Sequence, residues 1–395
     1  MDNSLPPVSP NVPPSLPPSL PPPPRLSPPS PTLPRKGRGW KVAAFILAFL
    51  LLVSLVFNPL HFVRLILTGT TAPARTAGPK LEEALVEDND SPNKIAVVPV
   101  EGVISGELME RGNYGMVDYI KDELKMAAQD DHVKAVLLKV NSPGGEVLAA
   151  DEISNAINKF QTDSGKPVIV SMGSLAASGG YYVSAPCRWI VANELTITGS
   201  IGVIMQTFNF RGLMNKVGVR PLVYKSGRFK DMLSGEKDLD NLTPEEKEDL
   251  AAEEKMVKNL IKQTFDKFKS VVAEGRKQSN KKNQDNQDKD KGAKGQPLDS
   301  NWTDYADGRV LSGNEAHELG LVDEVGNFEV AVKRARKLAK IESANLVQYQ
   351  QIFDFSSLFR LLGKSEATKI KIDVGLDAPK LKVGQLYFLS PTFAQ

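Results

Sequence analysis

The sequence predicts an α/β domain built on a mostly parallel sheet. From residue 94 onward, two kinds of segment alternate. Short apolar runs rich in β-branched residues, such as VKAVLLKV (133–140) and PVIVSMG (167–173), end at glycine or proline and are typical of buried strands. Between these two runs, VLAADEISNAINKF (147–160) carries apolar residues at helical spacing. Strands that alternate with helices in this way favour parallel pairing.

Composition excludes several classes of protein. The chain has 49 Lys and Arg against 47 Asp and Glu, so no overall basic field indicates a nucleic-acid-binding protein. Its one cysteine, Cys187, rules out an intrachain disulfide, and the Cys/His spacings of structural zinc sites are absent. Because apolar residues flank Cys187 in SAPCRWIV, we expect a small core residue there.

The N-terminal segment is rich in proline, since residues 1–34 hold 15 of the 28 prolines. Proline fixes φ and has no N–H, so this stretch is expected to be extended and disordered. A tether is the simpler interpretation. A ligand for a proline-recognising groove is the alternative.

An apolar run follows, in which Ser54 is the one polar residue between Val42 and Phe57, and which resumes at Leu60 to Phe62. Its length is just enough to span a bilayer core as a helix. Trp40 and a basic cluster precede the run, so the positive-inside rule predicts a cytoplasmic N-terminus, with everything after about residue 60 on the outer side of the cytoplasmic membrane. A cleaved signal peptide is the alternative.

The later segments complete the expected order of elements. KIAVVPVEGVI opens the folded domain, and RWIVANE and GVRPLVYKS are further strand candidates. Thr243 and Glu246 form a capping box that should start a long helix reaching about Glu274. The polar stretch 276–296 has no apolar periodicity and is expected to be disordered and dispensable. The predicted organisation is a disordered cytoplasmic tail (1–39), a transmembrane anchor (40–63), a linker (64–93), a folded domain (94–345) with a disordered insertion (276–300), and a C-terminal extension (346–395).

One segment could carry catalytic chemistry, namely VSMGSLAASGGYYVS (170–184). The pattern predicts an apolar strand that ends at Met172–Gly173, then a turn of small residues, after which Ser178-Gly179-Gly180 leads into a helix. A serine near a helix N-terminus faces free N–H groups that favour developing negative charge, as an acyl-transfer nucleophile requires. The alternative is a small-residue turn that allows close helix packing.

A second such segment is VNSPGGEV (140–147), interpreted as strand, turn and helix. Its turn offers backbone N–H groups at Gly144 and Gly145. They could supply the other half of an oxyanion hole, or the segment could be only a connection between a strand and a helix.

A serine nucleophile needs a base, and the sequence leaves its identity open. None of the three histidines, His61, His132 and His317, has neighbours that suggest an oriented triad. A lysine serves as a base if burial lowers its pKa towards neutrality. The candidate is Lys230 in YKSGRFKDML, although from the residues alone it could be another exposed lysine.

Five ordered motifs over roughly residues 94–340 together resemble bacterial signal peptide peptidases of the SppA type, in their short, membrane-anchored form. They are NSPGG, GSLAASGGYY, TITGSIGVIM (196–205), KSGRFKDM (225–232) and ADGRVLSGNEAHELGLVDEVG.

The resemblance implies a Ser-Lys dyad, with Ser178 as nucleophile and Lys230 as general base. It implies that Ser200 holds the lysine amine, and that the N–H groups of Gly179 and Gly145 form the oxyanion hole. The implied fold is the crotonase-like and Clp-protease-like superhelix of ββα units, assembled into homo-oligomeric rings whose active sites often use groups from neighbouring subunits. Neither a metal nor another cofactor is implied.

The expected function is therefore that of a serine endopeptidase anchored in the lipid bilayer. Its substrates would be signal peptide remnants and other extended apolar peptides. The alternatives are a related quality-control protease and a catalytically inactive scaffold on the crotonase-like fold. The proline-rich lead, the insertion and the C-terminal extension depart from the family pattern, but none of them touches the motif residues.

Overall fold

The computed structural model describes residues 44–50, 79–107, 114–285, 295–351 and 386–389. The chain divides into two units, Met1–Thr76 and Ala77–Gln395, and the sheet belongs to the second. Of the predicted anchor, the described part is a helix over residues 44–50, and the proline-rich lead lies outside the described residues. Among the described residues, no helix has both the length and the apolar character needed to cross a bilayer.

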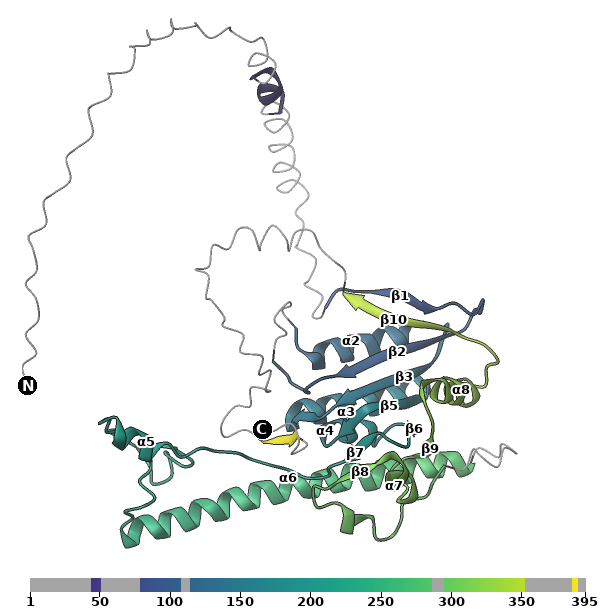
Figure 1. Ribbon diagram of the computed structural model, residues 1–395. Helices are drawn as coiled ribbons and strands as arrows, with labels where there is room; N and C mark the ends of the chain where they lie inside the picture. The colour runs from purple at the N-terminus through teal and green to yellow at the C-terminus, as the bar shows by residue number, and fades with distance from the viewer. Residues whose placement is uncertain (1–43, 51–78, 108–113, 286–294, 352–385, 390–395) are drawn as a thin grey trace, which may run out of the picture. The chain divides into compact units, whose positions relative to one another are not determined.

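A nine-stranded, mostly parallel sheet forms the centre of the second unit (Figure 1). Neighbouring strands pair in parallel from β10 across to β9, while β1 joins the edge antiparallel to β10. A short strand, β7, pairs with the end of β5 and also with β8. In spatial order the strands are β1 (Leu81–Glu87), β10 (Asn345–Gln351), β2 (Lys94–Glu101), β3 (Val133–Ser142), β5 (Val168–Ala177), β6 (Trp189–Ala192) and β9 (Glu324–Val325), with β7 (Ile197–Gly199) and β8 (Val310–Ser312) beside them.

Helices cover both faces of the sheet because the strands are apolar on both. Along β3, Val136 and Leu138 pack on one face with α2 and α3, and Leu137 packs on the other with α8. Cys187 is buried in the first of these cores, as predicted. The helices are α2 (Met116–Gln129), α3 (Val147–Ser164), α4 (Gly179–Ser184), α5 (Arg211–Lys216), α6 (Pro244–Asp285), α7 (Gly313–Glu318) and α8 (Phe328–Ala339), with a 3₁₀ turn at Trp302–Tyr305.

The sheet is wider than predicted, because two of its strands come from segments assigned to a linker and to a C-terminal extension. β1 lies within the predicted linker 64–93, and β10 lies between β1 and β2. Both strands carry several polar residues, LEEALVE and NLVQYQQ, so neither shows the apolar run that revealed the central strands. Their pairing joins residues far apart in the sequence, which local patterns do not report.

The predictions for the middle of the chain need two corrections. Helix α6 does not end near Glu274 but continues to Asp285, and Arg276 within it is fully buried. The predicted insertion therefore includes part of the core, while residues 286–294 lie outside the described residues. The stretch 218–226, predicted as a strand, has no strand partner and exposes Leu222 and Tyr224.

Candidate active site

Ser178 occupies a strained position between β5 and α4. Strand β5 runs past Gly173 to Ala177, so Ser178 follows it directly as the N-cap of α4. Its φ of 53° and ψ of −113° lie where residues other than glycine are rarely found. The backbone is held on both sides, because Ser178 N donates to Gly199 O at 2.9 Å and Ser178 O accepts from Tyr182 N at 2.8 Å. The surrounding hydrogen bonds thus hold the serine in a conformation it would not adopt alone.

The hydroxyl of Ser178 is left without a partner by this arrangement. The residue is 1% exposed, and its Oγ has no hydrogen-bond partner among the described residues. An unpaired buried hydroxyl costs about 1–3 kcal/mol and is rare outside functional sites. A strained serine with an unused hydroxyl at a strand-to-helix junction is well suited to nucleophilic attack.

Backbone from another strand lies directly against Ser178. The segment SPGGE does not form the predicted turn but a short strand, β4 (Gly144–Glu146). A Cβ added at Gly144, whose φ is +104°, would lie 2.6 Å from the Gly179 nitrogen, and one at Gly179 would lie 3.1 Å from the Gly145 nitrogen. The N–H groups predicted to form the oxyanion hole are therefore close together, and only glycine permits this approach.

Ser200 completes what we call the serine cradle, made of Ser178, Gly179, Gly144, Gly145 and Ser200. It is buried, has a φ of 49°, and its N–H donates to Arg309 O at 2.7 Å. Its neighbour Gly199 accepts the Ser178 N–H, so Ser200 is next to the nucleophile candidate in space, although 22 positions later in sequence.

The described histidines do not bond the Ser178 hydroxyl. His132 precedes β3, and its Nδ1 lies 3.0 Å from Pro92 O. Because β3 and β5 are parallel, the start of β3 lies at the opposite edge of the sheet from Ser178, which follows the end of β5. His317 lies on α7, and His61 is outside the described residues.

The fold of a single chain does not bring the Lys230 side chain to the serine cradle. This residue lies exposed in a turn, where its N–H donates to Gly227 O at 3.1 Å. This turn belongs to an arm, residues 205–243, which contains α5 and leads into the start of α6 (Figure 1). Because Ser178 Oγ has no partner among the described residues, the Lys230 amine does not bond it here. The structure thus unites Ser178, Ser200, Gly145 and Gly179, but not Lys230.

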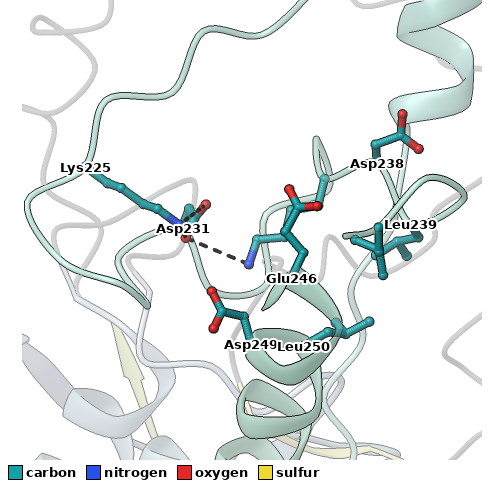
Figure 2. Close-up of a pocket in the computed structure, with 9 residues that line it drawn as sticks. Lys225, Asp231, Asp238, Leu239, Glu246, Asp249 and Leu250 are labelled. Carbon is teal, nitrogen blue, oxygen red and sulfur yellow. Dashed lines mark hydrogen bonds and ion pairs between the residues drawn. The ribbon is translucent and has the colours of Figure 1, made fainter. Parts of the chain in front are cut away.

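Salt bridges connect the arm around Lys230 to the first turns of α6, and Figure 2 shows the ion pair of Lys225 with Asp231 inside the arm. Lys225 Nζ lies 2.8 Å from Asp231 Oδ1, and Arg228 pairs with Asp249 on α6. Lys237 bridges to Glu253, also on α6, and lies 3.8 Å from Asp231. We call these contacts the arm clamp. They position the residues on both sides of Lys230 while its own side chain stays in solvent.

The arm also exposes many apolar side chains, Tyr224 being 92% exposed. Exposed apolar side chains in such number are typical of an interaction site in soluble proteins. The exposed apolar residues are Phe208, Phe210, Leu213, Val217, Val219, Leu222, Val223, Tyr224, Met232 and Leu239.

Sequence reasoning missed one part of the site. The described C-terminal segment forms β11 (Tyr387–Leu389), which pairs with β4 beside the cradle, and Phe388 contacts Tyr182 and Phe268. The sequence contains no local signal for this contact, because more than 200 residues separate β4 from β11. In the described part of the chain, no cluster of three His, Cys, Asp or Glu side chains could hold a metal ion.

Comparison with known proteins identifies relatives over most of the folded unit. The sequence profile of peptidase family S49 matches residues 160–299 and 293–342. A putative signal peptide peptidase SppA of Enterococcus faecium is 36% identical over 69% of this chain and 71% of its own length. A putative protease of Synechocystis is 34% identical over 72% of this chain and 88% of its own length. Protease 4 of Haemophilus influenzae is 36% identical over 67% of this chain but only 38% of its own length.

Proposed function

The chain belongs to peptidase family S49 as a serine peptidase of the SppA type, and from this premise we propose that Ser178 and Lys230 form its catalytic dyad. The observation that carries the proposal is the strained, buried Ser178, whose unpaired hydroxyl lies beside the backbone of Gly145 and Gly179. Nucleophile and oxyanion donors are then held by main chain, which is the most rigid support available.

In the proposed reaction, Ser178 Oγ attacks the carbonyl carbon of the substrate peptide bond while Lys230 accepts its proton. The resulting oxyanion accepts hydrogen bonds from the N–H groups of Gly145 and Gly179, each worth about 10²–10³-fold in rate. Ser200 orients the amine. The lysine then returns the proton to the leaving amine, and water hydrolyses the acyl-enzyme through the same groups.

We place the lysine at the cradle of a neighbouring copy of the chain. An amine acts as a base only after losing its proton, and burial among apolar groups favours the neutral form. Two features support delivery from another copy: Lys230 is exposed on the arm, and the same arm exposes apolar side chains that an assembly would bury. This arrangement fits a homo-oligomeric ring.

The proposed substrates are extended apolar peptides, including signal peptide remnants. The anchor over residues 40–63, with the catalytic domain on the outer side of the membrane, would bring the site close to such remnants. Its support is the apolar run with basic residues before it. A reporter fused after residue 90 tests this topology, since activity confined to the cytoplasm would contradict it. A quality-control protease with other substrates is the second candidate, and profiling cleavage of a membrane extract would separate the two.

The decisive experiment combines labelling with complementation. A fluorophosphonate probe should label the wild-type chain but not Ser178→Ala, and an unlabelled wild type would favour the inactive scaffold. Ser178→Ala and Lys230→Ala, each inactive alone, should recover activity when they are refolded together. With random assembly, one site in four has both intact groups, so about a quarter of wild-type activity is expected. No recovery in a mixed oligomer would place both groups on one chain.

A further inference from the structure

The peptide unit that joins Gly144 to Gly145 carries one of the two proposed oxyanion donors, the Gly145 N–H. Glycine lacks Cβ, so a peptide plane between two glycines rotates at little steric cost. Gly144 has a φ of +104°, within the region that favours glycine. The two glycines therefore do little by themselves to keep this N–H in one direction, and contacts from outside β4 must do so.

The segment 102–107, which follows β2, supplies these contacts. Ile104 N donates to Gly144 O, and Glu146 N donates to Ile104 O, both at 2.8 Å. The two backbones touch, since a Cβ added at Gly145 would lie 1.9 Å from Ile104 O. Ile104 is fully buried, so water does not compete for these bonds.

The bond from Ile104 fixes the direction of the oxyanion donor. In a trans peptide the C=O and the N–H point in opposite directions. Because Gly144 O points to Ile104, the Gly145 N–H of the same peptide points away from it, and a flip of the peptide would break the bond. The Gly145 nitrogen lies beside the second donor, since a Cβ added at Gly179 would be 3.1 Å from it.

The side chain of Glu146 anchors the segment that carries Ile104. Its Oε2 accepts the Gly106 N–H at 2.7 Å and lies 3.4 Å from the Ser105 hydroxyl oxygen. A hydrogen bond to a charged group is worth roughly 10- to 150-fold in an equilibrium constant. The carboxylate therefore favours the arrangement in which Ile104 stays against β4.

We propose that Glu146 is a positioning residue for the peptidase reaction. It holds the segment 102–107 in place, Ile104 of that segment holds the Gly144 carbonyl, and the Gly145 N–H is thereby kept in the direction that an oxyanion requires. Glu146 acts through Ile104 and does not touch the reacting atoms. The inference rests on the proposed function of Ser178 and the two N–H donors. The competing role for the carboxylate is recognition of a basic residue in the substrate.

Two conservative variants of the full chain separate reach from charge. Glu146→Gln keeps the length of the side chain and an acceptor oxygen, whereas Glu146→Asp keeps the charge but is one methylene too short for Gly106 N. An aspartate is favoured at a helix N-cap, the position that Glu146 holds on α3, so this variant should fold.

Kinetics with a fluorogenic apolar peptide compare the two variants. Positioning predicts that kcat falls about 10- to 100-fold in Glu146→Asp and less than about 5-fold in Glu146→Gln, with KM nearly unchanged in both. The opposite order would show that the charge matters, and it would overturn the positioning role. A loss confined to substrates with a basic residue would overturn it as well.

A matched pair of inhibitors reports on the oxyanion donors themselves. A peptide aldehyde forms a hemiacetal with Ser178, and its oxygen takes the place of the oxyanion, whereas the corresponding peptide alcohol forms no bond. Glu146→Asp should raise the Ki of the aldehyde by the factor by which it lowers kcat, and leave the Ki of the alcohol within about 2-fold. Equal changes for both inhibitors would mean that Glu146 shapes the groove and does not position the donor.

Glu101→Ala is the matched control, because it removes an exposed acid at the end of β2 that pairs with Lys139. This variant should keep the wild-type kcat and both Ki values. Wild-type kinetics in Glu146→Asp, with turnover still abolished by Ser178→Ala, would refute the positioning role alone. Turnover that survives Ser178→Ala would instead refute the proposed function.

Discussion

The serine cradle and the arm are built in opposite ways, although the proposed chemistry needs both. The cradle is buried, its groups are main-chain N–H donors, and glycines allow its strands to touch. The arm exposes apolar side chains, and salt bridges at its surface hold the turn of Lys230. Oxyanion donors must be positioned to a fraction of an ångström, which packed backbone achieves within one chain. A base can be delivered by assembly, provided that its turn keeps its shape.

Helix α6 connects the two regions and shows the same contrast along its length. Its first turns carry Asp249 and Glu253, which belong to the arm clamp. Further along, the ring of Phe268 packs against the ring of Phe388, and Arg276 is buried beside Asp323. The start of the helix thus holds the arm, and its later turns pack in the core.

The largest effect should come from Lys230, where the comparison predicts loss of catalysis without loss of structure. Lys230→Arg should be as inactive as Lys230→Ala, with kcat/KM down by about 10³-fold or more, because a guanidinium does not give up its proton. Since the side chain is exposed, the melting temperature should not change. Ser200→Ala should be milder. If His132→Ala or His317→Ala abolishes turnover while Lys230→Arg keeps it, a histidine is the base.

Arg276 gives the next largest effect, on stability. Burial alone would lower the pKa of Arg276, but Asp323, together with smaller contributions from Tyr181 and Cys187, raises it, and the net shift is upward. Removing one partner leaves a buried charge, so Arg276→Ala should lower the free energy of unfolding by about 3–5 kcal/mol in urea denaturation. Lys277→Ala, on the exposed face of the same helix, should change it by less than about 0.5 kcal/mol. If Arg276→Ala left the free energy of unfolding unchanged, the prediction that the stretch 276–296 is dispensable would stand.

Glu123 should make the core sensitive to pH in a way that the arm is not. This side chain on α2 is 5% exposed, and burial raises its pKa from 4.5 to about 8. The folded state therefore keeps a proton that the unfolded state releases, so stability should fall as pH rises from about 4.5 to 8. Glu123→Gln should add about 2–4 kcal/mol at pH 8 and almost nothing at pH 4.5, measured from urea midpoints. The control, Glu248→Gln at an exposed position of α6, should follow the wild type. A parallel pH profile for Glu123→Gln would contradict the assignment.

The smallest effect is expected at the arm clamp. Asp231→Asn weakens the contacts with Lys225 and Lys237, so the turn that carries Lys230 should be held less rigidly. We expect kcat to fall about 3- to 10-fold with KM nearly unchanged, and stability to change by less than about 0.5 kcal/mol, as for exposed ion pairs. Asp266→Asn, which removes an exposed ion pair elsewhere on α6, should leave kcat unchanged. Equal kcat in both variants would show that the clamp does not position the base.

The sequence alone determined the central strands, the helix between them and the serine and glycine motifs. These features are local: buried parallel strands need apolar runs such as VKAVLLKV, an amphipathic helix needs its 3.6-residue period, and a close backbone approach needs glycine at Gly144 and Gly179. The capping box at Thr243 is local as well, and both of its hydrogen bonds are present.

Only the tertiary structure decided which distant segments meet. β1 and β10 are strands with several polar residues, and they are recognised as strands through their pairing with each other. Arg276 can be buried because its guanidinium pairs with the carboxylate of Asp323 in the core. Likewise, no pattern in the sequence connects Phe388 with Tyr182, nor shows that Lys230 stays in solvent. Periodicity reports how one segment divides its surface between core and solvent. It carries no information on which partner covers that surface, because the free energy of a long-range contact belongs to the pair and not to either segment.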